Sequence, residues 1–149
     1  MQMEPIKFYL VNEPYGCFSN FAPFPIVIDG KTWPTSEHYF QAQKFLENAH
    51  QEAIRTLVSP MDAARKGRDR KLPLRKDWEH VKDDIMLRAV REKFAQHAEL
   101  RTTLLETSEA KLIEHTPNDN YWADGGDGLG KNILGVILMR VREELRKKI

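Results

Sequence analysis

The stretch from Asp29 to Phe45, DGKTWPTSEHYFQAQKF, combines a turn, a helix start and a helix, and it carries the first candidate site residues. Its opening Asp-Gly pair is a turn signal. A proline then restricts the backbone ahead of Thr35 and Ser36, and either hydroxyl can act as the N-cap of a helix. The spacing of apolar residues predicts a helix from Ser36 to about Asn48. The residues expected on its apolar face are Tyr39, Ala42, Leu46 and Ala49.

Beside this apolar face lies a polar stripe of Glu37, Gln41 and Lys44. Spacings of four and seven residues place the three side chains on one side of a helix. The helical rise separates Glu37 from Lys44 by roughly 10 Å along the axis, and helical side chains lean toward the N-terminus, which shortens this gap. A carboxylate and an amine can therefore face one small ligand. The alternative is a glutamate favoured by the helix dipole and a solvated lysine.

Length and composition favour one ordinary globular domain spanning residues 1–149, with 41% hydrophobic and 30% charged residues. The net charge of +1 argues against a protein that coats nucleic acid by bulk charge. The single cysteine, Cys17, excludes an internal disulfide and suits a reducing compartment. Neither a membrane-spanning run nor a signal peptide is recognisable, so a cytoplasmic location is expected.

Two short β-branched and aromatic runs, residues 6–11 and 25–28, predict strands. Between them lies Phe18-Ser19-Asn20-Phe21-Ala22-Pro23. The two aromatic rings could stack on a flat base while Ser19 and Asn20 bind its edge. The alternative is that Phe18 and Phe21 anchor the loop in the core.

The middle of the chain predicts helices over residues 50–58, from Pro60 to near Gly67, over 78–97 and over 98–106, with Ser59 and Asp77 as caps. A short strand is predicted over residues 111–115. The segment 65–76 holds seven basic residues against one acid. Its arginines could bind the phosphates of a nucleotide or sugar phosphate, or the segment could be a solvated loop.

The second informative stretch is residues 121–132, YWADGGDGLGKN, in which four glycines occur within six residues. Apolar residues at helical spacing follow at once and predict a helix. Glycines let the backbone approach a ligand, and the two aspartates suit ribose hydroxyls better than phosphate. The loop lacks the ending of a Walker loop and the glutamate of an EF-hand. The five histidines and one cysteine show no metal-ligand spacing.

Together, GCFSNFAPFPI, DGKTWPTSEHYFQAQKF, MDAARKGRDRKLPLRKDWEHVKD, EHTPNDNYWADGGDGLGKNILG and LMRVREEL resemble the YbiA-like proteins, also called the NADAR family. The resemblance runs from about Ile6 to Leu145. It implies a single α+β domain that is mostly helical with a small β-sheet. One departure is Ala123, where the family typically has glycine, and this methyl group is strained only if the local φ is positive.

The resemblance implies an N-glycosidase that hydrolyses ribosylamino-pyrimidine phosphates, early intermediates of riboflavin synthesis. Removal of ADP-ribose from guanine, in nucleotides or nucleic acid, and a non-catalytic nucleotide or ADP-ribose sensor are the alternatives. No metal or cofactor is implied, and the expected partner is a small phosphorylated ligand, with nucleic acid ranked lower.

Two mechanisms fit these residues. Lys44 could form a Schiff base with the opened sugar while Glu37 moves protons. Alternatively, Glu37 or Asp127 could stabilise an oxocarbenium-like state while water attacks. The catalytic candidates are therefore Glu37, Lys44 and Asp127. The substrate-binding candidates are Phe18, Asn20, Phe21, Arg65, Arg68, Arg70, Trp78, Trp122, Asp124 and Asn132.

Overall fold

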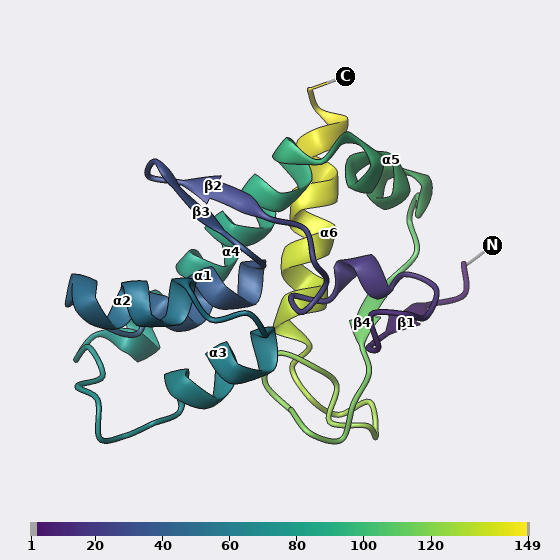
Figure 1. Ribbon diagram of the computed structural model, residues 1–149. Helices are drawn as coiled ribbons and strands as arrows, with labels where there is room; N and C mark the ends of the chain where they lie inside the picture. The colour runs from purple at the N-terminus through teal and green to yellow at the C-terminus, as the bar shows by residue number, and fades with distance from the viewer. Residues whose placement is uncertain (1–2, 149) are drawn as a thin grey trace. The chain divides into compact units, whose positions relative to one another are not determined.

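The computed structural model describes residues 3–148, which divide into two compact units. One unit contains residues 23–96, and the other combines the described N-terminal residues up to 22 with residues 97–148. Within the described chain, helices dominate and strands are short, as the predicted α+β class requires (Figure 1). The prediction of one domain over residues 1–149 stays a prediction.

The unit of residues 23–96 begins with an antiparallel hairpin of β2 (Ile26–Ile28) and β3 (Lys31–Trp33). The predicted turn at Asp29-Gly30 joins the strands, and both residues have positive φ values of 54° and 77°. Such a pair matches the right-handed twist of a hairpin. The sequence had predicted β2 but not β3, whose residues were assigned to the turn and helix entry. In Figure 1 the hairpin lies alongside α4 (Trp78–Gln96), and β2 contacts this helix.

Helix α1 (Ser36–Ala42) starts where predicted and ends early. Thr35 is its N-cap, because its hydroxyl accepts a hydrogen bond from the His38 backbone N–H at 3.1 Å. The predicted continuation to Asn48 was wrong. The chain instead leaves the helix through short turns, and the carbonyls of Gln43 and Lys44 accept hydrogen bonds from Arg75 at 3.4 and 2.8 Å. A distant arginine thus takes carbonyls that a longer helix would have used itself.

The early end of α1 changes two predictions about its faces. Lys44 lies in the turn after the helix, not two turns along it. Leu46, expected on the apolar face, is 70% exposed. The next helices of this unit are α2 (Asn48–Arg55) and α3 (Pro60–Gly67). Ser59 caps α3 through Met61 and Asp62, as predicted, whereas α2 starts and ends before its predicted bounds.

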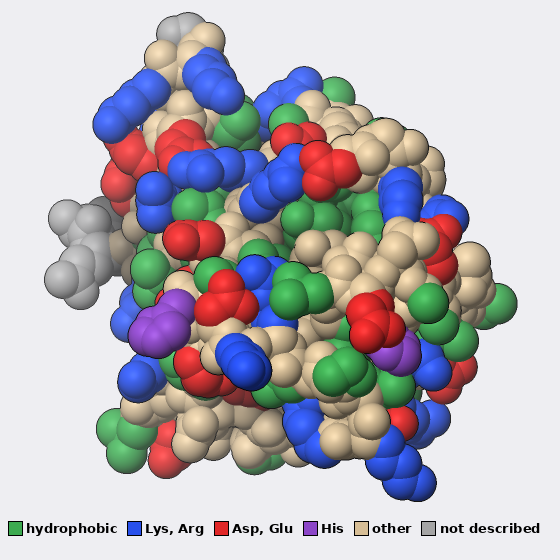
Figure 2. Space-filling view, turned by 90° about the vertical axis from the view of Figure 1, so that its left-hand side faces the viewer, with side chains coloured by type: hydrophobic (Ala, Val, Ile, Leu, Met, Phe, Trp, Pro, Cys, Tyr) green, Lys and Arg blue, Asp and Glu red, His purple; other side chains and the backbone are tan. Residues whose placement is uncertain are grey.

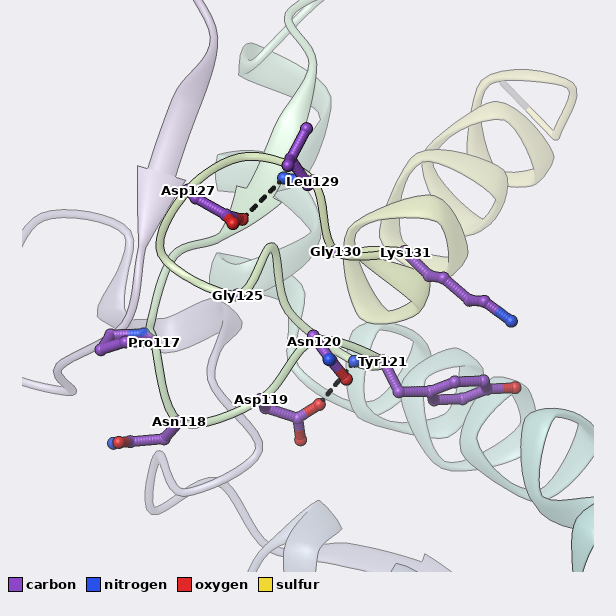
Figure 3. Close-up of a pocket in the computed structure, with 10 residues that line it drawn as sticks. All are labelled: Pro117, Asn118, Asp119, Asn120, Tyr121, Gly125, Asp127, Leu129, Gly130 and Lys131. Atoms are coloured by element: carbon purple, nitrogen blue, oxygen red, sulfur yellow. Dashed lines mark hydrogen bonds between the residues drawn. The ribbon is translucent and has the colours of Figure 1, made fainter.

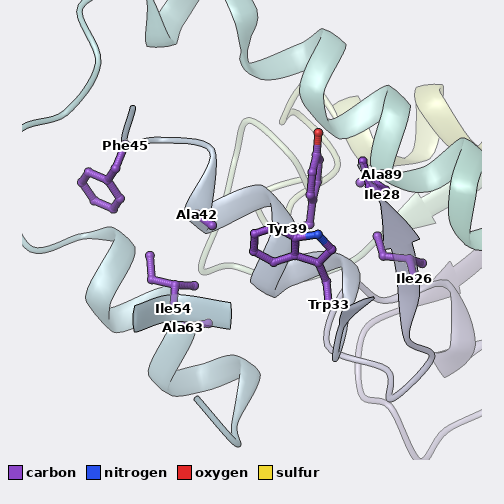
Figure 4. Packing of buried hydrophobic residues seen from close by; sticks show 9 residues of the cluster. All are labelled: Ile26, Ile28, Trp33, Tyr39, Ala42, Phe45, Ile54, Ala63 and Ala89. Atoms are coloured by element: carbon purple, nitrogen blue, oxygen red, sulfur yellow. The ribbon is translucent and has the colours of Figure 1, made fainter. Parts of the chain in front are cut away.

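The core of this unit brings the hairpin and all four helices together. Trp33 and Tyr39 pack edge to face with ring centroids 5.4 Å apart. Figure 4 shows this pair between the strand residues Ile26 and Ile28 on one side and the helical residues around Ile54 on the other. Helix α1 contacts α2, α3 and α4, so the helix that carries Glu37 is surrounded by other elements. Its position is therefore fixed by packing.

The other unit is organised by a parallel pair of β1 (Ile6–Phe8) and β4 (Leu112–Glu114), far apart in sequence. β1 is shorter than predicted, and the pairing itself had not been predicted. A short 3₁₀ turn at Gly16–Phe18 follows β1. Helix α5 (Ala98–Glu106) has its predicted bounds, and α6 (Ile133–Arg146) packs on both α5 and β4. No helix of the described residues is long and apolar enough to cross a bilayer.

Candidate active site

Glu37, Gln41 and Lys44 form a buried polar cluster at α1 and the turn that follows it. Their exposed fractions are 8%, 5% and 8%. Nε2 of Gln41 donates a hydrogen bond to Oε2 of Glu37 at 2.8 Å. Nζ of Lys44 donates to the carbonyl of Gly67, the last residue of α3, at 3.4 Å. The predicted stripe is therefore present, although Lys44 reaches it from the turn and not from the helix.

The surroundings of Lys44 lower its pKa and so increase the fraction of neutral amine. Burial is the largest cause, and with the positive charges of Arg70 and Arg68 it lowers the lysine pKa to about 8, while Glu37 and Glu79 act in the opposite direction. Buried ammonium groups lose hydration, and a nearby positive charge adds repulsion. About a tenth of such an amine is unprotonated at pH 7. A neutral amine is the form that attacks carbon, and the role of Lys44 as a nucleophile stays a prediction.

Trp78, the first residue of α4, covers the lysine. Its ring centroid lies 5.8 Å from Nζ of Lys44, and its other neighbour is the ring of Phe40 at 5.1 Å. The tryptophan is 6% exposed. The ring therefore belongs to the core and also borders the amine, while its predicted role in substrate binding stays a prediction.

The three arginines predicted to bind phosphate differ in their surroundings. Arg68 and Arg70 are exposed, and both act electrostatically on Lys44. Arg65 is also exposed and pairs with Asp62 at 3.4 Å on the surface of α3. A phosphate bound near the lysine would therefore meet Arg68 and Arg70 first. Their role as phosphate contacts stays a prediction.

Phe18 and Phe21 of the aromatic loop belong to the other unit, and these two predicted stacking residues differ in burial. Phe18 is 1% exposed and packs against Phe8 and Tyr15 at 5.7 and 5.6 Å. This burial favours the core interpretation for Phe18. Phe21 is only half-buried, so its ring is the better candidate for stacking. The neighbouring Asn20 is 8% exposed.

Two polar residues of the glycine-rich stretch hold this stretch in place. The Asp124 carboxylate accepts hydrogen bonds from the ring Nδ1 of His115 at 2.7 Å and from the backbone of Thr116 and Gly126. Burial acts to raise the Asp124 pKa, but these hydrogen bonds outweigh it and keep the pKa below its usual value. Asn132 bridges the backbone of Leu112 and Glu114. Ligand binding by either side chain would compete with these bonds.

Residues of the segment 117–131 line an open hollow of about 720 Å³ (Figure 3). Asp127 lines it and is exposed, while its carboxylate accepts a hydrogen bond from the Leu129 N–H at 2.9 Å. Trp122 is half-buried and packs edge to face on Tyr121 at 5.0 Å. Ala123 is fully buried and is not among the described residues with positive φ, so its methyl group introduces no backbone strain.

The sequence did not predict two side-chain contacts at the candidate site residues. Gln41 was assigned to the polar stripe but given no role, although it contacts Glu37 directly. His115 was not selected, and only the folded β4 and the loop bring it to Asp124. No pattern in the sequence signals the second contact. Among the described residues, no group of three or more His, Cys, Asp or Glu side chains could hold a metal ion.

Comparison with known proteins identifies the family. The NADAR domain matches residues 7–146. The chain belongs to the NADAR family. It is 63% identical over 145 residues to N-glycosidase YbiA of Escherichia coli K12, with 97% of this chain and 91% of the relative covered. The NMR structure of E. coli YbiA superposes with a TM-score of 0.92, covering 99% of this chain and 88% of that one at 61% identity. The predicted family and fold class are thereby confirmed.

More distant NADAR relatives carry two kinds of name. An N-glycosidase of Nostoc punctiforme is 46% identical over 144 residues, with 95% of this chain and 92% of the relative covered. A riboflavin biosynthesis protein of Vibrio vulnificus is 44% identical over 144 residues, covering 97% of this chain but only 39% of that longer protein. The same domain therefore occurs by itself and as part of a larger protein.

Proposed function

We propose that this NADAR protein is an N-glycosidase that hydrolyses ribosylamino-pyrimidine phosphates, with Lys44 as nucleophile and Glu37 as proton shuttle. Relatives that share 63% and 46% of its sequence are named N-glycosidases, and the riboflavin name of the Vibrio relative supports this substrate class. The protein is a glycosyl hydrolase, and its substrate is a small molecule. The lysine mechanism is our inference from the geometry around α1.

The observation that carries the mechanism is the buried Lys44, whose pKa is lowered to about 8 beside the carboxylate of Glu37. A lysine on the surface, exposed to solvent, keeps its charge and its ordinary pKa. Here burial and two arginines favour the neutral amine, which is the form that attacks a carbonyl or imine carbon. An amine–carboxylate pair in one enclosed cluster provides both a nucleophile and an acid–base group.

The reaction begins with the exocyclic nitrogen that joins ribose to the pyrimidine. Its lone pair opens the sugar ring and forms an imine at C1. The neutral Lys44 amine adds to C1, and Glu37 transfers a proton to the base nitrogen, which leaves as the free amine. Water then adds to the lysine imine, and cleavage of the C1–Nζ bond returns Lys44 and releases ribose phosphate. One water is consumed, and no redox change occurs.

The competing mechanism keeps the sugar ring closed. In that mechanism Glu37 or Asp127 stabilises an oxocarbenium-like state, and Lys44 contributes only its charge. We favour the nucleophilic role, because the lowered pKa of Lys44 increases the fraction of neutral amine, which a charge-only role does not need.

A direct assay tests the proposal. Purified protein is mixed with freshly prepared ribosylamino-pyrimidine phosphate, and mass spectrometry follows free pyrimidine and ribose phosphate. Wild type and the control Glu99→Gln, an exposed residue of α5, should release both products. Lys44→Ala and Glu37→Gln should lose at least about 100-fold in rate. Release no faster than the spontaneous decay would contradict the substrate assignment, and ADP-ribosylated guanine would then be assayed.

A further inference from the structure

Gln41 is a buried carboxamide that the mechanism above leaves without a role. It lies between Glu37, which belongs to the same helix, and Gly67, which ends α3. Its Nε2 donates to Oε2 of Glu37 at 2.8 Å. Its Oε1 is inaccessible to solvent and accepts no hydrogen bond. A buried acceptor without a donor is costly, so its presence beside a proposed proton shuttle needs an explanation.

The chemistry of the pair determines which way the carboxamide faces. An ionised carboxylate only accepts hydrogen bonds, so it requires the NH₂ group of the glutamine. The carbonyl oxygen is then forced to the other side, against Gly67, where no donor is provided. A protonated carboxyl group reverses this requirement, because its O–H donates and the glutamine carbonyl can accept. Rotation of the amide by half a turn exchanges the two arrangements.

We propose that Gln41 is a positioning residue for Glu37, which donates to the ionised carboxylate and turns to accept from the protonated one. In this way the carboxyl group keeps a matched partner at both stages of proton transfer. The unpaired Oε1 marks the arrangement that serves the ionised form. This inference rests on the proposed function, since it assigns a cause to the acid–base behaviour of the same site.

Gly67 provides the space that this arrangement needs. A Cβ atom built on Gly67 would lie 1.9 Å from Oε1 of Gln41 and 2.7 Å from its Cδ. These distances are far below van der Waals contact, so any side chain at this position would push the carboxamide away from Glu37. The φ angle of Gly67 is not in the left-handed region, so glycine is required here by space and not by backbone conformation. A substitution at Gly67 therefore offers a second test of the position of the Gln41 carboxamide.

Other charged groups act on the same cluster from the neighbouring elements. Lys44 follows α1, Arg68 and Arg70 follow α3, and Glu79 belongs to the first turn of α4. The charges of α2 and β3 are engaged with each other, because Glu52 accepts from Arg55 and Lys31. His38 of α1 is buried, and burial lowers its pKa despite its hydrogen bond to the Leu57 carbonyl. Neutral substitutions at Gln41 or Gly67 leave all these charges in place.

The test uses Gln41→Met, which keeps the length of the side chain but removes both hydrogen-bonding atoms. The substitution removes both arrangements, but the hydrogen bond to the ionised carboxylate is the stronger one, so its loss makes Glu37 easier to protonate. The acidic limb of the kcat profile that belongs to Glu37 should move up by about one pH unit. The kcat measured at pH values below this limb should fall roughly tenfold, while kcat at neutral pH and KM change little. Gln41→Glu, which places two carboxyl groups together, should move the limb further in the same direction.

Gly67→Ala gives a second route to the same change, because it displaces the carboxamide without altering Gln41. Its shift should match that of Gln41→Met, and the double variant should shift no further, as expected for two residues acting through one contact. The control is Gln96→Leu, which removes a glutamine that bridges the Val27 backbone and lies outside the cluster. It should lower stability without moving the limb.

A titration separates failure of this inference from failure of the proposed function. Carbon NMR of protein labelled at glutamate carboxyl groups follows Glu37 without any turnover, with Glu37→Gln assigning its signal. A midpoint that rises in Gln41→Met and Gly67→Ala supports the coupling. Unchanged midpoints in both variants overturn it, even if wild type cleaves the substrate. A shifted midpoint in a protein that cleaves no ribosylamino-pyrimidine would retain the coupling and reject the substrate.

Discussion

At the residue scale, Lys44 is 8% exposed, and burial is the largest cause of its lowered pKa. The sequence predicted Glu37 and Lys44 on one side of a single helix, whereas the structure brings Lys44 to the same cluster from the turn after α1. The sequence could not predict that Oε1 of Gln41 is buried without a hydrogen-bond donor, or that this carboxamide packs directly against Gly67. Both depend on the packing of α3 against α1. Contacts between elements distant in sequence leave no local pattern.

Arg70→Ala should raise the pKa of Lys44 above about 8, because it removes the largest charge that opposes the ammonium form. The neutral amine is the reactive form, so the rate should rise with pH through this pKa, and the variant should need higher pH for the same rate. At pH 7 its kcat/KM should fall roughly three- to tenfold from the amine alone. The measurement is the pH profile of kcat/KM.

Lys76→Ala is the matched control for that profile. Lys76 is an exposed charge of the same basic segment and is not among the main groups that act on Lys44. Its midpoint should equal that of wild type. An Arg70→Ala profile that also keeps the wild-type midpoint would contradict the electrostatic account of Lys44.

At the scale of elements, helix caps were predictable and one helix end was not. Thr35 and Ser59 act as N-caps as their positions indicate, and α5 has its predicted bounds. α1 stops at Ala42 because Arg75, more than thirty residues away, binds the carbonyls that follow it. The parallel pairing of β1 with β4 likewise joins segments about a hundred residues apart. Local propensity carries no information on either contact.

Thr35→Ala should destabilise the protein by about 1–2 kcal/mol, since the hydroxyl caps α1 and also lies 2.8 Å from Nδ1 of the buried His38. Urea unfolding at pH 7.5 measures this loss. The helix carries Glu37, so kcat should fall as well. The matched cap variant Ser59→Ala in α3 should lose about 1 kcal/mol and keep most of its activity. Equal activity in both variants would contradict the view that the α1 cap positions Glu37.

At the scale of the whole molecule, the net charge bears on whether the substrate is a small phosphorylated molecule or a nucleic acid. The net charge is +1, and on the face shown in Figure 2 basic and acidic side chains are interspersed.

The resemblance of several long strings predicted the family and the fold class, both of which the comparisons confirm. The predicted site residues occur in both compact units, with Glu37, Lys44 and the arginines in residues 23–96.

Turnover of a small phosphorylated substrate should depend weakly on salt. Raising ionic strength from 50 to 200 mM should change kcat/KM by no more than about tenfold, since only one or two phosphate charges are neutralised. A nucleic-acid substrate bound through six or more phosphates would lose about a thousandfold over the same range. Steady-state rates at several salt concentrations measure this dependence. A steep loss with the small substrate would contradict a site that binds a single phosphate group.

Reductive trapping shows directly whether Lys44 attacks the sugar. Wild-type protein is incubated with ribosylamino-pyrimidine phosphate and sodium borohydride, digested, and analysed by mass spectrometry. We expect a reduced ribose phosphate adduct on the peptide that contains Lys44, and neither adduct nor turnover in Lys44→Arg. Full turnover by Lys44→Arg, with no adduct on the wild-type peptide, would contradict the lysine mechanism and favour hydrolysis with the ring closed.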